Sequence, residues 1–167
     1  MIFTINSPKY GLKEVQIDDE DWPLVSRYKW HVQFDPTFHQ FYIVTCSLNG
    51  KTIKAIKLHR LVMNQEDPKM KVDHIDHDTL NNRKENLRAC TGQNNGWNSK
   101  KTKRTTASKY KGVTKIQRGT GFVSRIGLDN KRLYLGYFKT EEEAALAYNE
   151  AALKYHKEFA CLNETKE

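Results

Sequence analysis

A short polar segment constrains this chain more than any other: VDHIDHDTLNNRKENLRACTGQNNGWN, at residues 72–98. A predicted strand ends near Val72, and a polar loop follows at residues 75–83. Residues 86–90 predict a second strand, and Thr91 has the hydroxyl that suits the N-cap of a helix. The segment therefore predicts the order strand, loop, strand, helix, in which two elements direct polar side chains to one place.

Four side chains of this segment have a chemistry in common. Asp73 offers an anionic oxygen and Asn95 a neutral carbonyl oxygen, which are hard ligands of the kind that Mg²⁺ or Mn²⁺ prefers. His74 follows Asp73 directly and can take a proton from water near neutral pH. Asn86 could hold either the loop or the His74 ring in place. Hydrolysis of a phosphodiester needs an activated water and a cation beside the phosphate, so we predict a one-metal nuclease site.

The net charge of +8 comes from one stretch of the chain. Residues 100–118 carry eight Lys and Arg and no Asp or Glu, whereas the segments on either side are nearly neutral. Residues 100–109 have no large apolar side chain, which predicts a flexible linker that binds phosphates. A solvated hinge without a partner is the alternative. The phosphate contacts expected here are Lys100, Lys101, Lys103 and Arg104.

Residues 110–165 predict a separate unit with a sheet and one helix. The strands are expected at residues 110–117, 122–128 and 131–138. Thr140 and Glu143 have the spacing of a capping box at the start of the helix. A cationic and aromatic sheet face would suit a DNA groove, and an ordinary solvated face is the alternative. Alternation puts Phe122, Ser124, Ile126, Leu133 and Leu135 on the helix side, and Arg125, Arg132 and Tyr134 on the opposite side.

Residues 1–57 are expected to be mostly β. The run from Phe41 to Leu48 is rich in β-branched and aromatic residues, and Asn49-Gly50 favours a tight hairpin turn after it. Residues 58–63 have the apolar spacing of a short helix, which includes His59. For His59, a hydrogen-bonded structural role is favoured over a contact with phosphate or with the metal environment.

Composition excludes several classes of protein. The chain has no run of about 18 apolar residues, so no transmembrane helix is expected. Residues 1–16 lack the basic-then-apolar order of a signal peptide. The three cysteines form no C-x-x-C pair, which argues against a zinc ribbon or a disulfide framework. We therefore expect a cytoplasmic protein that contacts no membrane.

The polar segment resembles the HNH family of ββα-metal nucleases, and in particular its phage and intron-encoded homing branch. The matching pieces are DHID at residues 73–76, LNNR at 80–83, ENLR at 85–88, Thr91 to Asn95, and LHRLV at 58–62. The resemblance implies that Asp73 and Asn95 bind the metal and that His74 is the general base. It makes Asn86 the asparagine that supports the active-site geometry, and it implies a phage-encoded protein in a bacterial host.

The same family often has Gly-Asn in the loop, where this chain has His77-Asp78. This departure leaves an extra ligand or DNA contact open at His77, although a surface loop is favoured.

Residues 110–165 resemble the ethylene-response-factor (Apetala-type) DNA-binding domain of plants, which is also seen fused to phage HNH nucleases. The matching pieces are YKGV at 110–113, RLYLGYF at 132–138, TEEEAA at 140–145 and ACLN at 160–163. Thr114, Ile116 and Gly127 stand where the plant domains often have arginine, so the base selectivity of those domains does not transfer. The resemblance implies contacts with double-stranded DNA at Lys111, Arg118, Arg125, Arg132 and Tyr134.

Together these features predict an α+β protein. An N-terminal β-rich segment would lead into a ββα-metal nuclease unit, followed by a three-stranded antiparallel sheet packed on one helix. The expected domains are an HNH nuclease domain at 1–99 with its core motif at 58–98, a basic linker at 100–109 and a DNA-binding domain at 110–167. The expected reaction is homing-type, metal-dependent cleavage of double-stranded DNA, by nicking or by a double-strand cut, in a monomer or homodimer.

Three other functions stay open at this point. The first is a catalytically inert DNA-binding or regulatory protein, against which the intact polar set weighs. The second is a nuclease of structured RNA. The third is a zinc-stabilised structure that uses Cys90 with histidines, although the spacing fits no common zinc site.

Overall fold

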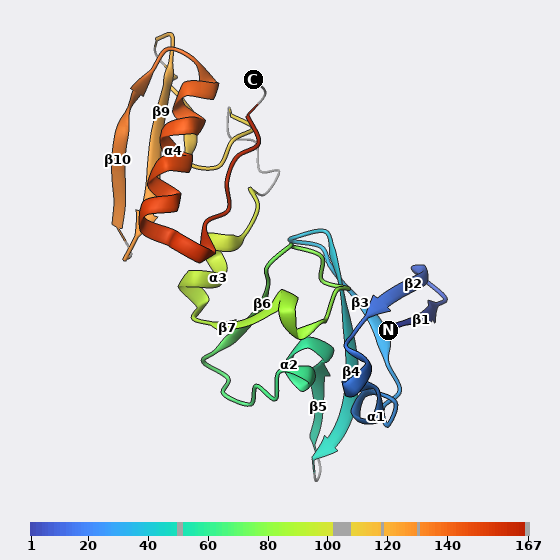
Figure 1. The fold of residues 1–167 in the computed structure, drawn as a ribbon. Helices are drawn as coiled ribbons and strands as arrows, with labels where there is room; N and C mark the ends of the chain where they lie inside the picture. The colour runs from blue at the N-terminus through green and yellow to red at the C-terminus, as the bar shows by residue number, and fades with distance from the viewer. Residues whose placement is uncertain (50–51, 102–107, 118, 130, 166–167) are drawn as a thin grey trace. The chain divides into compact units, whose positions relative to one another are not determined.

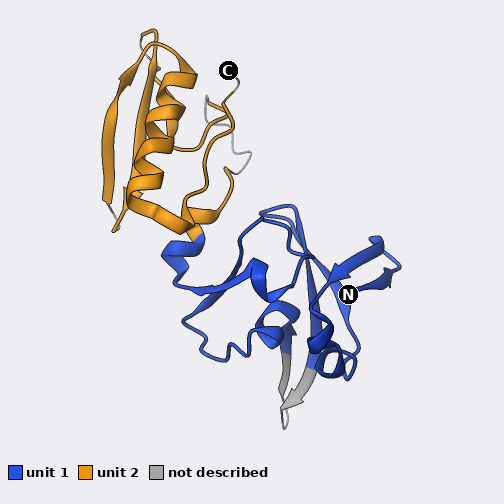
Figure 2. Ribbon diagram, viewed as in Figure 1, with its two compact units in different colours: residues 1–95 blue, residues 96–167 orange. Residues whose placement is uncertain are grey.

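A computed structural model describes residues 1–49, 52–101, 108–117, 119–129 and 131–165. The protein has the predicted α+β class (Figure 1). Its residues group into two compact units, which we call the N-terminal unit (1–95) and the C-terminal unit (96–167) (Figure 2). The boundary falls within helix α3 (Gly92–Asn98), so this helix contributes residues to both units.

Small antiparallel sheets make up the described part of the N-terminal unit. They are β1 (Ile2–Ser7) with β2 (Gly11–Gln16), then β3 (His31–Asp35), β4 (Gln40–Asn49) and β5 (Thr52–Lys57) in that order, and β6 (Lys71–His74) with β7 (Leu87–Cys90). The short helical segments are η1 (Asp19–Asp21), α1 (Trp22–Val25), α2 (Leu58–Val62) and η2 (Lys84–Asn86). The hairpin β4–β5 and the helix at α2 confirm the prediction, although Gly50 of the expected turn lies outside the described residues.

One apolar core holds the sheets of the N-terminal unit together. Val15 and Ile17 are completely buried, as is Leu58 of α2. Val72 of β6 and Leu87 of β7 join the same core. Burial of one such side chain stabilises a fold by about 1.5–3 kcal/mol, so the β6–β7 ribbon is fixed through residues that flank its polar side chains.

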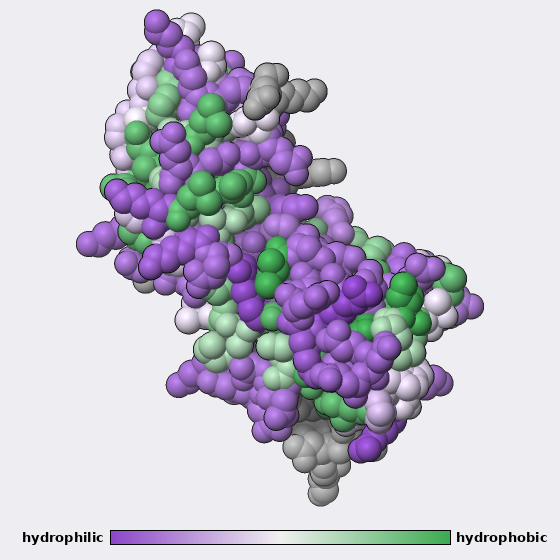
Figure 3. Space-filling view, viewed as in Figure 1, coloured by the Kyte–Doolittle hydropathy of each residue, from purple (hydrophilic) through white to green (hydrophobic). Residues whose placement is uncertain are grey.

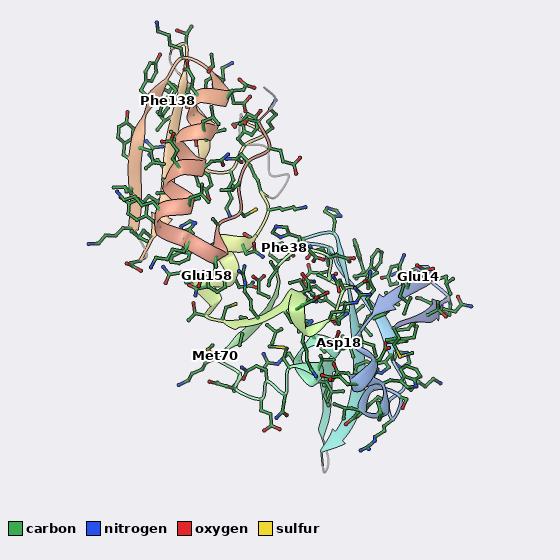
Figure 4. The ribbon with its side chains drawn as sticks, in the orientation of Figure 1. Glu14, Asp18, Phe38, Met70, Phe138 and Glu158 are labelled. Atoms are coloured by element: carbon green, nitrogen blue, oxygen red, sulfur yellow. The ribbon has the colours of Figure 1, made fainter. Side chains whose placement is uncertain are left out.

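Arg60 of α2 fixes the chain that leads into β6. Its Nη1 donates to the Met70 carbonyl and its Nη2 to the Asp67 carbonyl, each at 2.8 Å. Met70 lies on the loop just before β6 (Figure 4). The helix α2 therefore positions the strand that carries Asp73 and His74.

The C-terminal unit packs a three-stranded antiparallel sheet on one long helix (Figure 1). The strands β8 (Val113–Lys115), β9 (Phe122–Leu128) and β10 (Lys131–Phe138) lie in the order β10-β9-β8, and α4 (Glu141–His156) and η3 (Lys157–Phe159) follow. The capping box predicted at Thr140 is present, because its hydroxyl accepts from the Glu143 N–H and the Glu143 carboxylate accepts from the Thr140 N–H. The alanines and Tyr148 of α4 pack on Ile126 and Val113, and Phe138 (labelled in Figure 4) joins them.

The bounds of β9 and β10 are those predicted, whereas β8 is shorter than the expected strand at 110–117. The reason lies at Gly112, whose φ of +78° starts a turn rather than a strand. The Val113 N–H closes that turn on the Tyr110 carbonyl. A Cβ at Gly112 would lie 2.1 Å from the Tyr148 ring, so glycine is required there for close packing as well.

The predicted alternation of the sheet holds in β9 but not throughout β10. Ser124 and Ile126 are buried on the helix side, as expected. Leu133 was also expected there, but it is 41% exposed, because it lies on the edge strand of the sheet. The register then shifts between Tyr134 and Gly136, which brings Tyr137 opposite Val123.

Figure 3 shows that hydrophilic side chains cover most of the face in view, with small apolar patches between them. Exposed apolar side chains are scattered over both units, for example Ile75 in the N-terminal unit and Leu153 on α4. Single exposed apolar side chains are normal on soluble domains and carry no functional argument.

Candidate functional site

The β6–β7 ribbon buries the first two residues of the predicted site. Asp73 is 7% exposed and His74 is 6% exposed. In the ribbon, Asp73 stands opposite Arg88 and His74 opposite Leu87. Arg88 donates from Nε at 3.0 Å and from Nη2 at 2.8 Å, both to Oδ2 of Asp73. The site thus contains a nearly buried ion pair that the sequence analysis did not predict.

Aromatic rings surround His74. The His59 ring meets it edge-on, with centroids 5.0 Å apart and an interplanar angle of 88°. Tyr42 packs against both imidazoles, edge-on against His59 and tilted against His74. Burial lowers the pKa of His74, and a hydrogen bond to Asn82 opposes that shift. Burial also holds the pKa of His59 well below its ordinary value, so both rings are neutral at pH 7.

Asn82 indicates which nitrogen of His74 carries the proton. Its Nδ2 donates to the Leu80 carbonyl at 3.0 Å and to the Thr79 carbonyl at 3.4 Å, which fixes the orientation of the amide. Its Oδ1 is then directed to His74 Nε2, at 3.5 Å. Because an amide oxygen only accepts, Nε2 carries the hydrogen in the neutral ring. The basic nitrogen of His74 is therefore Nδ1.

Asn86 closes the polar loop on itself. Its Nδ2 donates to Asp76 Oδ1 at 2.9 Å and to the Asn81 carbonyl at 2.8 Å, and its Oδ1 accepts from the Asp76 N–H at 3.0 Å. Burial alone would raise the pKa of Asp76, but hydrogen bonds from Asn81, the Asp78 N–H and Asn86 lower it below its ordinary value. Of the two roles considered for Asn86, these bonds favour holding the loop.

The N-terminal segment supports the far end of the same loop. The Gln16 N–H donates to the Leu80 carbonyl at 2.9 Å, and the Asn82 N–H returns to the Gln16 carbonyl at 2.8 Å. The Lys84 ammonium pairs with Glu20 and Asp21 at the start of α1. The β-rich segment that precedes the motif therefore serves as a platform for the loop.

His77 occupies the position where the related nucleases often have glycine. Its φ of +68° lies in the left-handed region that glycine favours. The Gln40 side chain donates to its carbonyl at 3.2 Å. The backbone geometry thus explains why glycine is suited to this place.

Helix α3 carries the last residue of the predicted set. Thr91 is its N-cap, as predicted, because its hydroxyl accepts from the Asn94 N–H at 3.2 Å. The Asn95 N–H donates to the Thr91 carbonyl in the first turn. Asn95 itself is half-buried. The helix therefore begins directly after β7, within four residues of Asn95.

The oxygen atoms of these side chains decide which cation the site could hold. Among the described residues, no three His, Cys, Asp or Glu side chains gather as a metal cluster. The predicted set needs no such cluster, because it pairs one carboxylate with one amide oxygen. The two bonds that Arg88 donates to Asp73 both end on Oδ2, so Oδ1 is the oxygen that would bind a cation. A hard cation that keeps several waters fits this sparse oxygen set.

The C-terminal unit brings three of the predicted DNA contacts onto one face of its sheet. Tyr134 stands opposite Arg125, and Arg132 stands opposite Gly127, all pointing away from the helix. Tyr134 is 56% exposed, and both arginines are exposed. Tyr137 joins this face through the register shift, and sequence alternation alone missed it. The glycine at 136, inside a strand, was the available signal of a bulge.

Two predicted DNA contacts instead hold carbonyl groups inside the C-terminal unit. Lys111 Nζ donates to the Trp97 and Ser99 carbonyls, each at 2.6 Å, and burial lowers its pKa. Lys101 Nζ donates to the Ser108 and Tyr110 carbonyls at 2.6 and 2.8 Å. These contacts favour a structural role for both lysines. Lys100 is exposed, and Lys103, Arg104 and Arg118 lie outside the described residues.

Comparison with known proteins gives the family. A family model described as HNH endonuclease matches residues 57–97, which contain α2, β6, β7 and most of α3. A protein of Acanthamoeba polyphaga mimivirus, named as an uncharacterized HNH endonuclease, is 36% identical over 148 residues, which are 87% of this chain and 72% of that protein. The chain belongs to the HNH endonuclease family. This HNH chain is accordingly a nuclease, as its polar segment predicts.

Plant transcription factors match a smaller part of this HNH endonuclease. PLT2 and AIL7, two AP2-like ethylene-responsive transcription factors of Arabidopsis thaliana, are each 53% identical over 51 residues. Those residues are 29% of this chain and only 9–10% of the plant proteins. The partial likeness supports the DNA-binding domain predicted for this nuclease. Among the described residues, no helix is long and apolar enough to cross a membrane.

Proposed function

We propose that this HNH endonuclease hydrolyses phosphodiester bonds of double-stranded DNA with a divalent cation, Mg²⁺ or Mn²⁺. Asp73 and Asn95 would hold the cation, and His74 would be the general base. One observation carries the proposal: a carboxylate and a neutral imidazole lie next to each other on a buried strand, within a segment that matches the HNH family. A site that only stabilised the fold through the Asp73–Arg88 ion pair would not need a neutral imidazole next to it.

His74 accepts a proton from the attacking water at Nδ1, since Nε2 is directed to Asn82. The lowered pKa keeps the ring in its basic form at neutral pH, as a general base requires. A divalent cation held by Asp73 and Asn95 would supply positive charge that offsets the charge of the phosphate during cleavage. The products are 5′-phosphate and 3′-hydroxyl ends, as the likeness to the homing branch implies.

Asn86 is a positioning residue in this account. It binds the loop through Asp76 and Asn81, and that loop carries Asn82, which orients the His74 ring. Asn86 touches neither the water nor the phosphate. Its loss would therefore act through the geometry of the loop.

The DNA would be gripped mainly by a domain at residues 110–167, with the basic linker 100–109 on the phosphates. The exposed sheet face with Arg125, Arg132 and Tyr134 suits a groove, since strands can enter the major groove and arginine can bind guanine. The nuclease domain at residues 1–99 would then cut nearby. A monomer with one site fits nicking, and a homodimer fits a double-strand cut.

A cellular setting follows from the same likeness. We place the enzyme in the cytoplasm of a bacterial host, as a phage-encoded, homing-type nuclease. Deep sequencing of the ends produced on a random DNA library would test the homing assignment. A long preferred sequence would support it, and ends scattered without preference would contradict it.

Supercoiled plasmid tests the proposal most simply. The wild-type protein is expected to relax or linearise the plasmid with Mg²⁺ or Mn²⁺, and an excess of chelator should stop the reaction. Asp73→Asn, which keeps the size of the side chain, should bind the plasmid and leave it intact. Binding without cleavage by the wild type would favour the inert DNA-binding alternative. Preferential cleavage of structured RNA over duplex DNA in competition would favour the RNA nuclease.

A further inference from the structure

The proposed cation ligand Asp73 already has a positive partner. Arg88 stands directly opposite it in the β6–β7 ribbon and reaches Oδ2 with two nitrogens, at 2.8 and 3.0 Å. The side chains are 9% exposed for Asp73 and 15% exposed for Arg88. This contact is therefore a well-formed, mostly desolvated ion pair, whereas the cations of the other ion pairs among the described residues are 32–60% exposed.

An ion pair of this kind stabilises the carboxylate before any cation arrives. A buried carboxylate without a partner is costly, and removing one member of such a pair destabilises proteins strongly. Arg88 thus holds the Asp73 carboxylate in one orientation in the cation-free protein. The guanidinium is also held in register by the strand pairing, so it cannot be treated as a mobile surface arginine.

The same contact lowers the affinity of Asp73 for a cation. A divalent cation on Asp73 would share one carboxylate with a guanidinium, and the two positive groups repel each other. Resting on the proposed function, we infer that Arg88 is a built-in counter-ion that competes with the divalent cation for Asp73. It holds the site assembled without metal and weakens the affinity of the site for the cation.

Binding of Mn²⁺ to the full-length protein tests this inference without an activity assay. Free Mn²⁺ is counted by its electron paramagnetic resonance signal during titration of the wild type, Arg88→Gln, Arg88→Lys and Asp73→Asn. Removal of the unit charge in Arg88→Gln is expected to tighten binding by about tenfold, even with screening close to that of water. Arg88→Lys keeps the charge and should stay within about threefold of the wild type.

Thermal melting shows whether each variant is folded. Arg88→Gln should melt at a lower temperature than the wild type without cation, because Asp73 loses its partner. Saturating Mn²⁺ should raise its melting temperature by more than it raises that of the wild type. If Arg88→Gln is unfolded without cation, recovery of the fold on addition of Mn²⁺ supports the inference, and failure to recover contradicts it.

The outcomes distinguish a failure of the competition by Arg88 from a failure of the cation site at Asp73. Equal or weaker Mn²⁺ binding by Arg88→Gln would overturn the competition while leaving the cation site in place. Unchanged Mn²⁺ binding by Asp73→Asn would overturn the cation site itself, whatever Arg88 does. Tighter binding by Arg88→Gln together with lost binding by Asp73→Asn is the result that the inference requires.

Discussion

Replacement of Asn86 by alanine tests whether this residue holds the loop that follows His74. The change removes the three hydrogen bonds that its side chain makes, two with Asp76 and one with the Asn81 carbonyl. At about 1 kcal/mol for each bond, the free energy of unfolding should fall by about 3 kcal/mol. That is a large fraction of the total of about 5–15 kcal/mol expected for a domain.

Two further variants give a scale for this loss in the free energy of unfolding. Asn81→Ala removes one strong bond to the same carboxylate, at 2.8 Å, and should cost about 1 kcal/mol. Asn86→Asp keeps the shape of the side chain but puts a second carboxylate beside Asp76. At neutral pH it should therefore destabilise the protein at least as much as Asn86→Ala.

Urea unfolding of the full chain, with hydrogen exchange of peptides that cover residues 75–86, measures these effects. The exchange should rise in this loop of Asn86→Ala before the C-terminal unit responds. DNA cleavage should fall with it, while DNA binding is kept. If Asn86→Ala loses no more stability than Asn81→Ala, the side chain of Asn86 does not hold the loop as proposed.

Other parts of the molecule give equally direct predictions. Gly112→Ala should lower the stability of the C-terminal unit by more than about 2 kcal/mol, because the new Cβ would overlap the Tyr148 ring and the backbone at Gly112 has a positive φ. Gly127→Ala is the control in thermal melts, because a Cβ at Gly127 would meet no atom within 4 Å. Arg132→Ala should weaken DNA binding and lower by about one the slope of the logarithm of the binding constant against the logarithm of the salt concentration. Lys111→Met should lower the stability of the protein and leave that slope unchanged. Equal slopes for the two variants would contradict a DNA contact at Arg132 and a structural role for Lys111. Burial lowers the pKa of His156, so the unfolded chain binds the proton first. Stability is then full above about pH 6.5 and falls below it, and His156→Gln should flatten this dependence in melts from pH 7.5 to 5.

The lowered pKa of His156 follows from the contacts of its ring. Its Nε2 donates to the Gly127 carbonyl at 2.8 Å, while Nδ1 is buried and has no partner among the described residues. Trp97 stacks on the ring, with centroids 4.3 Å apart. A second proton would therefore sit on a buried nitrogen without an acceptor, which is why burial dominates the shift.

The sequence predicted the elements whose signals are local. The bounds of β9 and β10, the capping box at Thr140 and the N-cap at Thr91 all follow from side chains within a few residues. The alternation in β9 predicted which side chains face the helix, because period-two patterns need no distant partner.

The features that the sequence analysis missed depend on residues far apart in the chain. The partner of Asp73 is set by the register of β6 on β7, which the sequence does not fix by itself. The lysines at 101 and 111 look like phosphate contacts in a basic stretch, yet their long side chains reach backbone carbonyls. Net charge alone cannot tell these two uses of lysine apart.

The shorter β8 and the turned end of β10 have a different cause. A glycine conformation at Gly112 and a bulge next to Gly136 both break a regular pattern. Each glycine was visible in the sequence, but its positive φ was not. Strand propensity therefore overestimated β8, and the alternation pattern did not assign Tyr137 to a face of the sheet.

A single-turnover cleavage assay on His74→Ala shows whether this imidazole is the general base. With saturating Mg²⁺ and DNA bound as tightly as by the wild type, the account predicts a rate at least about 100-fold lower, because the general base is gone. Added imidazole should restore part of the rate in this variant and leave the wild type unchanged. Full activity of His74→Ala without imidazole would contradict the claim that this imidazole deprotonates the attacking water.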